Sequence, residues 1–140
     1  MIVEGLLFIF FWLTMCGLWH ESMHLLEVDR QGSTSSYMWF VYKPFPGMRF
    51  SAGTGITNMD LVLLAGGIYT AILCFALSFI TLSVSHYLGW LFLTLGMTQL
   101  AYGYFEYAYI RKLSSKMYTV GRVIIYISIP IVMYLLLYPG

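Results

Sequence analysis

Three long stretches without a charged side chain restrict what this chain can fold into. They are Leu61–Ser85, Tyr87–Phe105 and Val123–Gly140. A transmembrane helix needs roughly 20 mostly apolar residues, and each stretch is close to that length. A fourth stretch, Gly5–Leu26, is long enough if the polar motif near its end belongs to the helix. Charged residues make up 9% of the chain and hydrophobic residues 60%, whereas a soluble domain carries about 25% charged residues.

We therefore expect an all-α integral membrane protein that forms a single transmembrane domain over residues 1–140, with about four transmembrane helices. The expected helices cover residues 5–26, 60–84, 87–110 and 118–138. The first helix is expected to be retained, because Glu4 stands where a signal peptide would carry basic residues.

The basic residues fall in two of the intervals between the apolar stretches. In chain order, they are Arg30, Lys43 and Arg49 between the first and second stretches, and Arg111, Lys112, Lys116 and Arg122 between the third and fourth. Basic loops stay on the cytoplasmic side of a membrane. We therefore expect a multi-pass protein with both basic loops in the cytoplasm and both termini outside. No basic cluster of the kind that nucleic-acid binding needs is present, so nucleic acid is not an expected partner.

The first loop carries the pattern of a β-hairpin over residues 36–52. β-forming residues flank a turn sequence with proline and glycine, which predicts strands over Tyr37–Tyr42 and Met48–Ser51. Strand edges cannot face lipid, because their backbone groups would lack partners. A membrane-associated hairpin at the interface or against the helices is therefore expected. Its aromatic side chains, Trp39 and Tyr42 among them, fit either an interfacial anchor or a sheet edge that binds an extended peptide.

The sequence His20-Glu21-Ser22-Met23-His24 fits the pattern H-E-x-x-H. On a helix, His20 and His24 share one face and can converge on one ion. Zinc suits neutral imidazole nitrogens, and a catalytic zinc keeps three protein ligands and one open position. Glu21 would lie beside the metal as the general base and acid of a hydrolysis. The alternative is a pair of histidines hydrogen-bonded to neighbouring helices. A di-iron site is not expected, since no second E-x-x-H motif exists.

A third metal ligand has several candidates. Glu27 shares the face of the histidines but lies about 10 Å from His20 along the helix axis, which suits an outer position or solvent. Asp60 begins the second predicted span, where an aspartate is an ordinary helix-start residue. Glu106 lies about 7.5 Å short of the cytoplasmic end of the third span, at a depth similar to that of the histidines. A buried carboxylate needs a partner, so Glu106 is favoured over Asp60. The alternative partner for Glu106 is Arg111 or Lys112.

These motifs resemble the site-2 protease family of intramembrane zinc metalloproteases over about residues 5–112. Members carry H-E-x-x-H at the cytoplasmic end of a first core helix, followed by a membrane-associated hairpin or loop. Here Ala65-Gly66-Gly67-Ile68-Tyr69-Thr70 is similar to the small-residue motif of their second helix. Glu106 falls eight residues after Thr98, where the family has an aspartate as third zinc ligand. The chain departs from the pattern at Gly67, which replaces a proline, and at Thr70, which replaces an asparagine.

The resemblance implies an intramembrane zinc metalloprotease that hydrolyses peptide bonds in or near the membrane. Its zinc ligands would be His20, His24 and Glu106, and its catalytic residue Glu21. The group that stabilises the oxyanion or positions the substrate would be Thr70 or Asn58, with Trp39 and Tyr42 in a substrate-binding hairpin. Expected partners are a membrane-protein or peptide substrate and the lipid bilayer, with an oligomer or a regulatory membrane partner as further options. The rival class is a non-catalytic metal-binding subunit or pseudoprotease, favoured by a closed metal site with a fourth protein ligand such as Asp60.

Overall fold

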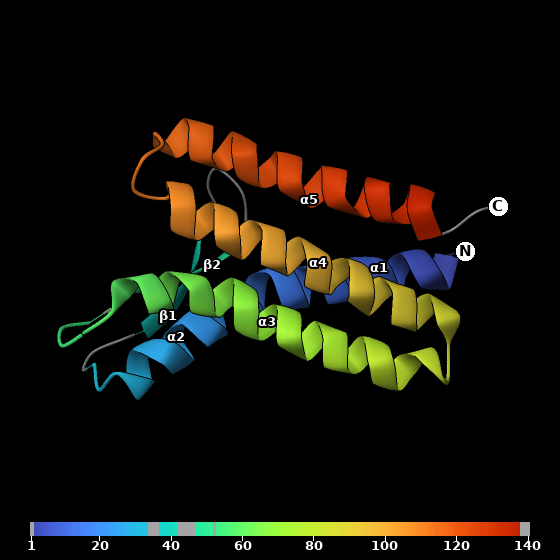
Figure 1. The fold of residues 1–140 in the computed structure, drawn as a ribbon, viewed down its shortest axis with the longest axis horizontal. Helices are drawn as coiled ribbons and strands as arrows, with labels where there is room; N and C mark the ends of the chain where they lie inside the picture. Colours follow the sequence, from blue (N-terminus) through green and yellow to red (C-terminus); the bar gives the residue numbers. More distant parts are fainter. Residues whose placement is uncertain (1, 34–36, 42–46, 52, 138–140) are drawn as a thin grey trace.

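The structure, a computed structural model, describes residues 2–33, 37–41, 47–51 and 53–137. The chain is mostly helical (Figure 1). Within the described residues, three helices are long and apolar enough to cross a membrane, namely Ile2–Arg30, Met59–Leu82 and Lys116–Leu136. The prediction of a largely helical chain with long apolar helices, as in a membrane protein, is therefore confirmed at this level.

The first helix is continuous but contains a change of helical type. It consists of α1 (Ile2–Leu13), the π-helix η1 (Thr14–Trp19) and α2 (His20–Arg30). A π-helix closes its hydrogen bonds over five residues instead of four, and such segments occur often at functional sites. This one ends directly before His20, so it sets the direction in which the H-E-x-x-H residues project. Relative to the predicted helix over 5–26, the helix extends further at both ends.

Helices α3 (Met59–Leu82) and α4 (His86–Tyr109) form an antiparallel pair joined by a short link (Figure 1). Each begins at a polar cap: the side chain of Asn58 accepts from the Leu61 N–H at 3.0 Å, and that of Ser85 accepts from the Leu88 N–H at 3.4 Å. Gly67 and Gly103 meet where the two helices cross, and a Cβ on either would overlap the other's backbone. Two glycines therefore allow backbone-to-backbone contact between α3 and α4.

Helix α5 (Ser115–Leu137) packs along α4 (Figure 1). Its remaining surface is apolar and exposed, as at Ile124 and Leu135, and the same is true of Phe79 on α3. Large exposed apolar surfaces mark contacts with a membrane or another protein. The outer surface of the bundle thus has the character that the hydrocarbon of a bilayer would cover.

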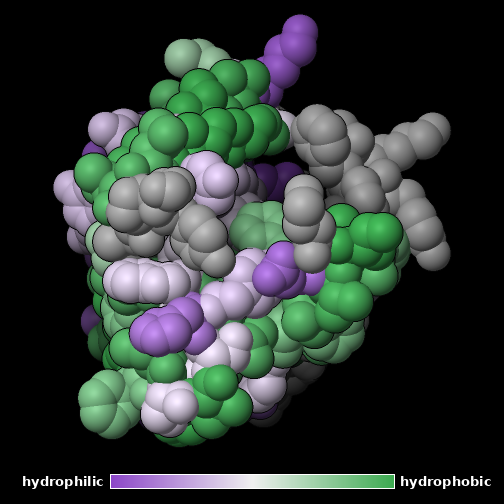
Figure 2. All heavy atoms as spheres, turned by 90° about the vertical axis from the view of Figure 1, so that its right-hand side faces the viewer, coloured by the Kyte–Doolittle hydropathy of each residue, from purple (hydrophilic) through white to green (hydrophobic). Residues whose placement is uncertain are grey.

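The two ends of the bundle carry different segments. The start of α1, the α3–α4 link and the end of α5 lie at one end (Figure 1). Figure 2 faces this end and shows a mostly hydrophobic surface crossed by a band of more hydrophilic residues. The end of α2, the start of α3 and the α4–α5 link lie at the opposite end, which carries Arg30, Arg111, Lys112 and Lys116.

Strands β1 (Tyr37–Val41) and β2 (Gly47–Ser51) pair antiparallel beside α2. Tyr37 is opposite Ser51 and Trp39 is opposite Arg49 in the register. Residues 42–46, where the turn of the predicted hairpin would fall, lie outside the described residues. The complete hairpin over 36–52 and its association with a membrane therefore stay predictions.

Candidate metal centre

His20, His24 and Glu106 come together in the interior of the helical bundle. The Nε2 atom of His20 lies 2.9 Å from Glu106 Oε2 and 3.1 Å from His24 Nε2. His24 Nε2 lies 3.3 Å from the same carboxylate oxygen. Both imidazoles are 0% exposed and Glu106 is 6% exposed. Two imidazole nitrogens and one carboxylate oxygen thus form a group that could hold a metal ion.

The local helical geometry explains why these atoms converge. His20 and His24 are separated by one turn of α2, so their side chains project from the same face. Their rings meet edge to face with centroids 4.7 Å apart. Glu106 stands in the last turn of α4 and reaches the same point from the other side. Two segments that are more than eighty residues apart in the sequence therefore build one site.

The other nitrogen of each imidazole fixes the orientation of its ring. His24 Nδ1 lies 2.6 Å from the Val62 carbonyl oxygen, and His20 Nδ1 lies 2.7 Å from Gln99 Oε1. In neutral rings whose Nδ1–H donates to these two oxygens, the lone pair is on Nε2. Both lone pairs then face the Glu106 carboxylate, and a cation among the three acceptor atoms would remove their mutual repulsion.

Gly66 brings α3 close to the histidines. A Cβ at this position would overlap the imidazole of His24. The same approach brings the carbonyl of Val62, one turn earlier on α3, to the Nδ1 atom of His24. Within the small-residue motif at Ala65–Gly67, Gly66 therefore contributes to the site because its lack of a side chain lets α3 approach His24.

Asp60, the alternative third ligand, lies away from this group. Its side chain is 57% exposed and pairs with Arg111 at 3.2 Å, across the start of α3 and the end of α4. Arg111 was the alternative partner considered for Glu106, and it is engaged here with Asp60 instead. Glu21 is half-buried and directly follows His20 on α2, but it is not one of the three residues of the group.

The residues predicted to bind substrate or an oxyanion have other positions. The side-chain oxygen of Asn58 is engaged as the N-terminal cap of α3. Thr70 is buried one turn after Gly66, and its hydroxyl has no hydrogen-bond partner among the described residues. Trp39 lies in β1 and is 41% exposed. Tyr42 falls outside the described residues.

Glu27 holds the end of α2 against α3 rather than facing solvent. It is fully buried and accepts hydrogen bonds from Arg30 Nε, Gln31 Nε2 and the Tyr69 hydroxyl, each at 2.9 Å. Gln31 in turn accepts from the backbone N–H of Asn58 at 2.8 Å. This network, which the sequence did not indicate, anchors the helix that carries both histidines.

Three further residues at the site also escaped the sequence interpretation. Gln99 contacts His20, Tyr102 lies against the His20 ring with centroids 4.9 Å apart, and Tyr118 contacts Glu106. Gln99 had a usable signal, since it is an amide in an uncharged span, two turns before Glu106. The tyrosines had none, because the chain contains 12 tyrosines.

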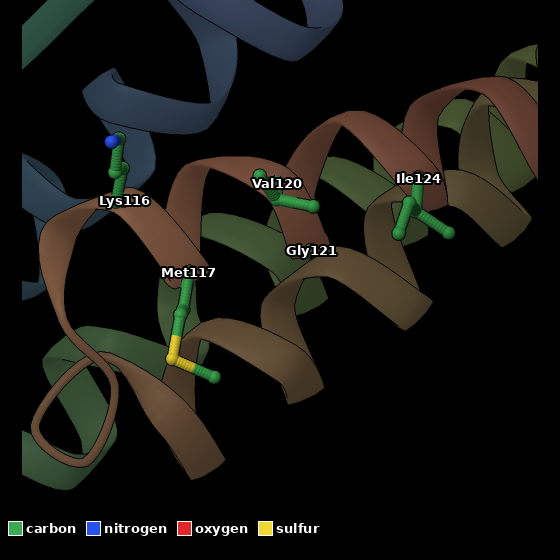
Figure 3. Close-up of a pocket in the computed structure, with 5 residues that line it drawn as sticks. All are labelled: Lys116, Met117, Val120, Gly121 and Ile124. Atoms are coloured by element: carbon green, nitrogen blue, oxygen red, sulfur yellow. The ribbon is translucent and has the colours of Figure 1, made fainter.

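A separate shallow groove of about 430 Å³ runs along α5, lined by Lys116, Met117, Val120, Gly121 and Ile124 (Figure 3). Its lining is almost entirely apolar and includes none of the three candidate metal ligands. Two of the lining residues, Met117 and Val120, lie on either side of Tyr118 in the sequence, but neither histidine lines the groove.

Comparison with protein-family models, curated proteins and solved structures found no match to this chain.

Proposed function

We propose that the chain is an intramembrane zinc metallopeptidase, in which His20, His24 and Glu106 hold zinc and Glu21 is the general base. The observation that carries the proposal is the convergence of two Nε2 atoms and one carboxylate oxygen within 3.3 Å of each other, with the glutamate of an H-E-x-x-H motif beside them.

The dimensions of the group suit zinc. Zinc–nitrogen and zinc–oxygen bonds of about 2.0–2.2 Å in a tetrahedron separate neighbouring ligand atoms by about 3.3–3.5 Å. The three separations here are 2.9, 3.1 and 3.3 Å, so a small outward movement accommodates the ion. Gln99 and the Val62 carbonyl supply the partners that zinc-binding imidazoles usually have on their second nitrogen. Three ligands leave a fourth position for water or substrate.

The reaction follows from the roles of the side chains. When bound, zinc lowers the pKa of a water and polarises the peptide carbonyl. Glu21 accepts a proton from the attacking water, whose oxygen bonds to the carbonyl carbon. As the C–N bond breaks, Glu21 returns that proton to the leaving amine. The substrate class we propose is a peptide or a membrane-protein segment that has unwound, because a helical carbonyl is already hydrogen-bonded.

We also propose that α4 crosses the membrane as the fourth span. It has the same length as α3 and packs antiparallel to it. Its lower hydropathy comes partly from polar residues that face inward, Thr98, Gln99 and Glu106 among them. Four crossings agree with the start of α1 and the end of α5 lying at one end of the bundle (Figure 1). The basic residues at the other end favour a cytoplasmic location for the metal centre and outside locations for the termini.

The test uses purified protein in detergent, a fluorophore-labelled unfolded protein and a labelled single-span membrane helix as substrates. We expect one zinc per wild-type chain and cleavage of at least one substrate. Glu21→Gln should retain zinc and lose activity by several orders of magnitude. Glu4→Gln, the same substitution in α1, is the matched control and should behave as wild type. Wild-type protein that copurifies with no zinc and binds none on addition contradicts the proposal.

A second candidate, a non-catalytic zinc-binding subunit, is favoured by one observation. All three candidate ligands are buried and Glu106 accepts a hydrogen bond from Tyr118, whereas a catalytic metal must exchange water and admit substrate. The two candidates differ in their response to a hydroxamate, which binds zinc only through open coordination positions. Zinc retention without hydroxamate binding favours the non-catalytic subunit.

A further inference from the structure

The Tyr118 hydroxyl is the one α5 group that makes a described hydrogen bond to a candidate metal ligand. Its O–H lies 3.2 Å from Glu106 Oε1, the carboxylate oxygen that does not face the histidines. The other oxygen, Oε2, faces both imidazoles. Glu106 is therefore held between the histidines on one side and a tyrosine of the last helix on the other.

The direction of these hydrogen bonds follows from their chemistry. An ionised carboxylate only accepts, so Tyr118 donates its proton to Glu106. The hydroxyl oxygens of Tyr118 and Tyr102 lie 2.9 Å apart. Because the proton of Tyr118 is committed, Tyr102 donates to Tyr118. The chain of donors runs from Tyr102 through Tyr118 to Glu106, and it polarises the Tyr118 hydroxyl as a donor.

The packing of α5 positions Tyr118 without enclosing it. Its ring stacks on Phe105 with centroids 5.4 Å apart and an interplanar angle of 23°. Gly121, one turn later, leaves room for the same phenylalanine. Tyr118 stands in the first turn of α5, close to the α4–α5 link, and is itself half-buried. Release of the hydroxyl from Glu106 breaks a single hydrogen bond of 3.2 Å.

The two residues considered for transition-state stabilisation are less well placed. The Asn58 side chain caps α3. The Thr70 hydroxyl has no partner in the part of the chain that the structure describes, and no described contact joins it to the three candidate ligands. Tyr118 already donates to Glu106 Oε1, which belongs to the same carboxylate as the candidate ligand atom Oε2.

We propose that Tyr118 is a catalytic residue that moves its hydrogen bond from Glu106 to the substrate, where it stabilises the oxyanion of the tetrahedral intermediate; this rests on the proposed peptidase function. Water adds to the carbonyl carbon while Glu21 takes its proton, and the carbonyl π electrons move onto oxygen. Tyr118 donates to that oxygen without losing its proton. When the C–N bond breaks, the electrons return to the carbonyl and Glu21 protonates the amine.

The experiment compares wild type with Tyr118→Phe, which keeps the ring that stacks on Phe105. Three quantities are measured: zinc affinity, kcat at saturating zinc, and affinity of the zinc-loaded protein for an apolar phosphinic peptide, a stable mimic of the tetrahedral intermediate. Removal of one oxyanion donor costs about 10²–10³ in kcat, and we expect a loss of this size in kcat and a parallel loss in phosphinic-peptide affinity. Tyr102→Phe should give a smaller loss, and Tyr104→Phe, at an exposed tyrosine of α4, should give none.

Several outcomes separate this proposal from the peptidase function itself. If saturating zinc restores both kcat and phosphinic-peptide affinity in Tyr118→Phe, the residue only positions Glu106 and the proposal is overturned. If Tyr118→Phe equals wild type while Glu21→Gln is inactive, the proposal fails and the peptidase function stands. If zinc-loaded wild type neither cleaves nor binds the phosphinic peptide, both are overturned. Thermal unfolding of each variant verifies that it is folded.

Discussion

At the residue scale, the candidate metal centre combines an obvious motif with partners that give weak signals or none. The H-E-x-x-H spacing and a lone carboxylate at matching depth were enough to select His20, His24 and Glu106 from the sequence. The orienting groups were harder to find. The Val62 carbonyl is a backbone atom, and its role depends on how closely Gly66 lets α3 approach His24. Such a contact has no side-chain signature.

Substitution of Gln99 by leucine tests the orienting role of its amide. The change removes the acceptor for His20 Nδ1–H, and loss of such a partner typically costs about 10- to 100-fold in metal affinity or activity. We expect a loss of zinc affinity in this range, measured by competition with a fluorescent chelator. The control is Thr98→Val, because among the described residues the buried Thr98 hydroxyl is seen to bond to the Thr94 carbonyl of its own helix and to no metal-ligand candidate. Equal zinc affinity in wild type and Gln99→Leu contradicts the assignment.

The choice between Glu106 and Asp60 can be decided by removing each carboxylate. Asp60→Ala breaks an exposed pair with Arg111, which contributes at most about 1 kcal/mol to the free energy of unfolding. It should leave the zinc content unchanged. Glu106→Ala should abolish stoichiometric zinc binding. The reverse pattern in elemental analysis of the two purified variants would assign the third ligand to Asp60.

At the element scale, the helices were predictable because an uncharged apolar run of this length is typical of a membrane-spanning helix. The change to a π-helix at Thr14–Trp19 was not, since its residues are compatible with an ordinary α-helix. For α5, sequence reasoning gave the approximate extent of the helix. It gave no indication that one of the tyrosines of α5 reaches Glu106.

The close approach of α2 and α3 predicts a strong effect of Gly66→Ala. The new Cβ would overlap the His24 ring, so the ring must rotate away from the Val62 carbonyl and the other ligands. Overpacking of this kind costs about 1–3 kcal/mol in the free energy of unfolding, and zinc affinity should fall with it. Gly5→Ala is the matched control, because nothing lies within 4 Å of a Cβ there. Wild-type zinc affinity in Gly66→Ala would show that α3 is not packed against His24.

At the scale of the whole molecule, the proposed four-span arrangement predicts opposite accessibility for the two exposed links. Ser83→Cys lies in the α3–α4 link and Lys112→Cys in the α4–α5 link. A membrane-impermeant maleimide should label the first in intact cells and the second only after permeabilisation, with the parent chain giving the background from its native cysteines. Labelling of both from one side contradicts four crossings, and an inverted pattern contradicts the cytoplasmic location of the metal centre.

The whole-molecule account explains why a site of this polarity can exist in so apolar a chain. Three of its carboxylates have described partners: Glu27 contacts Arg30, Asp60 contacts Arg111, and Glu106 contacts two imidazoles. The first two pairs are local or exposed and stabilise helix ends. The third is buried, and a bound cation would satisfy its three converging acceptors.

The central claim is tested most directly by the cleavage rate per bound zinc in wild type and Glu21→Gln, measured on the same preparations. The account predicts one zinc per chain in both proteins, cleavage by the wild type, and a loss of several orders of magnitude in the variant. Equal cleavage rates per bound zinc in the two proteins would contradict it.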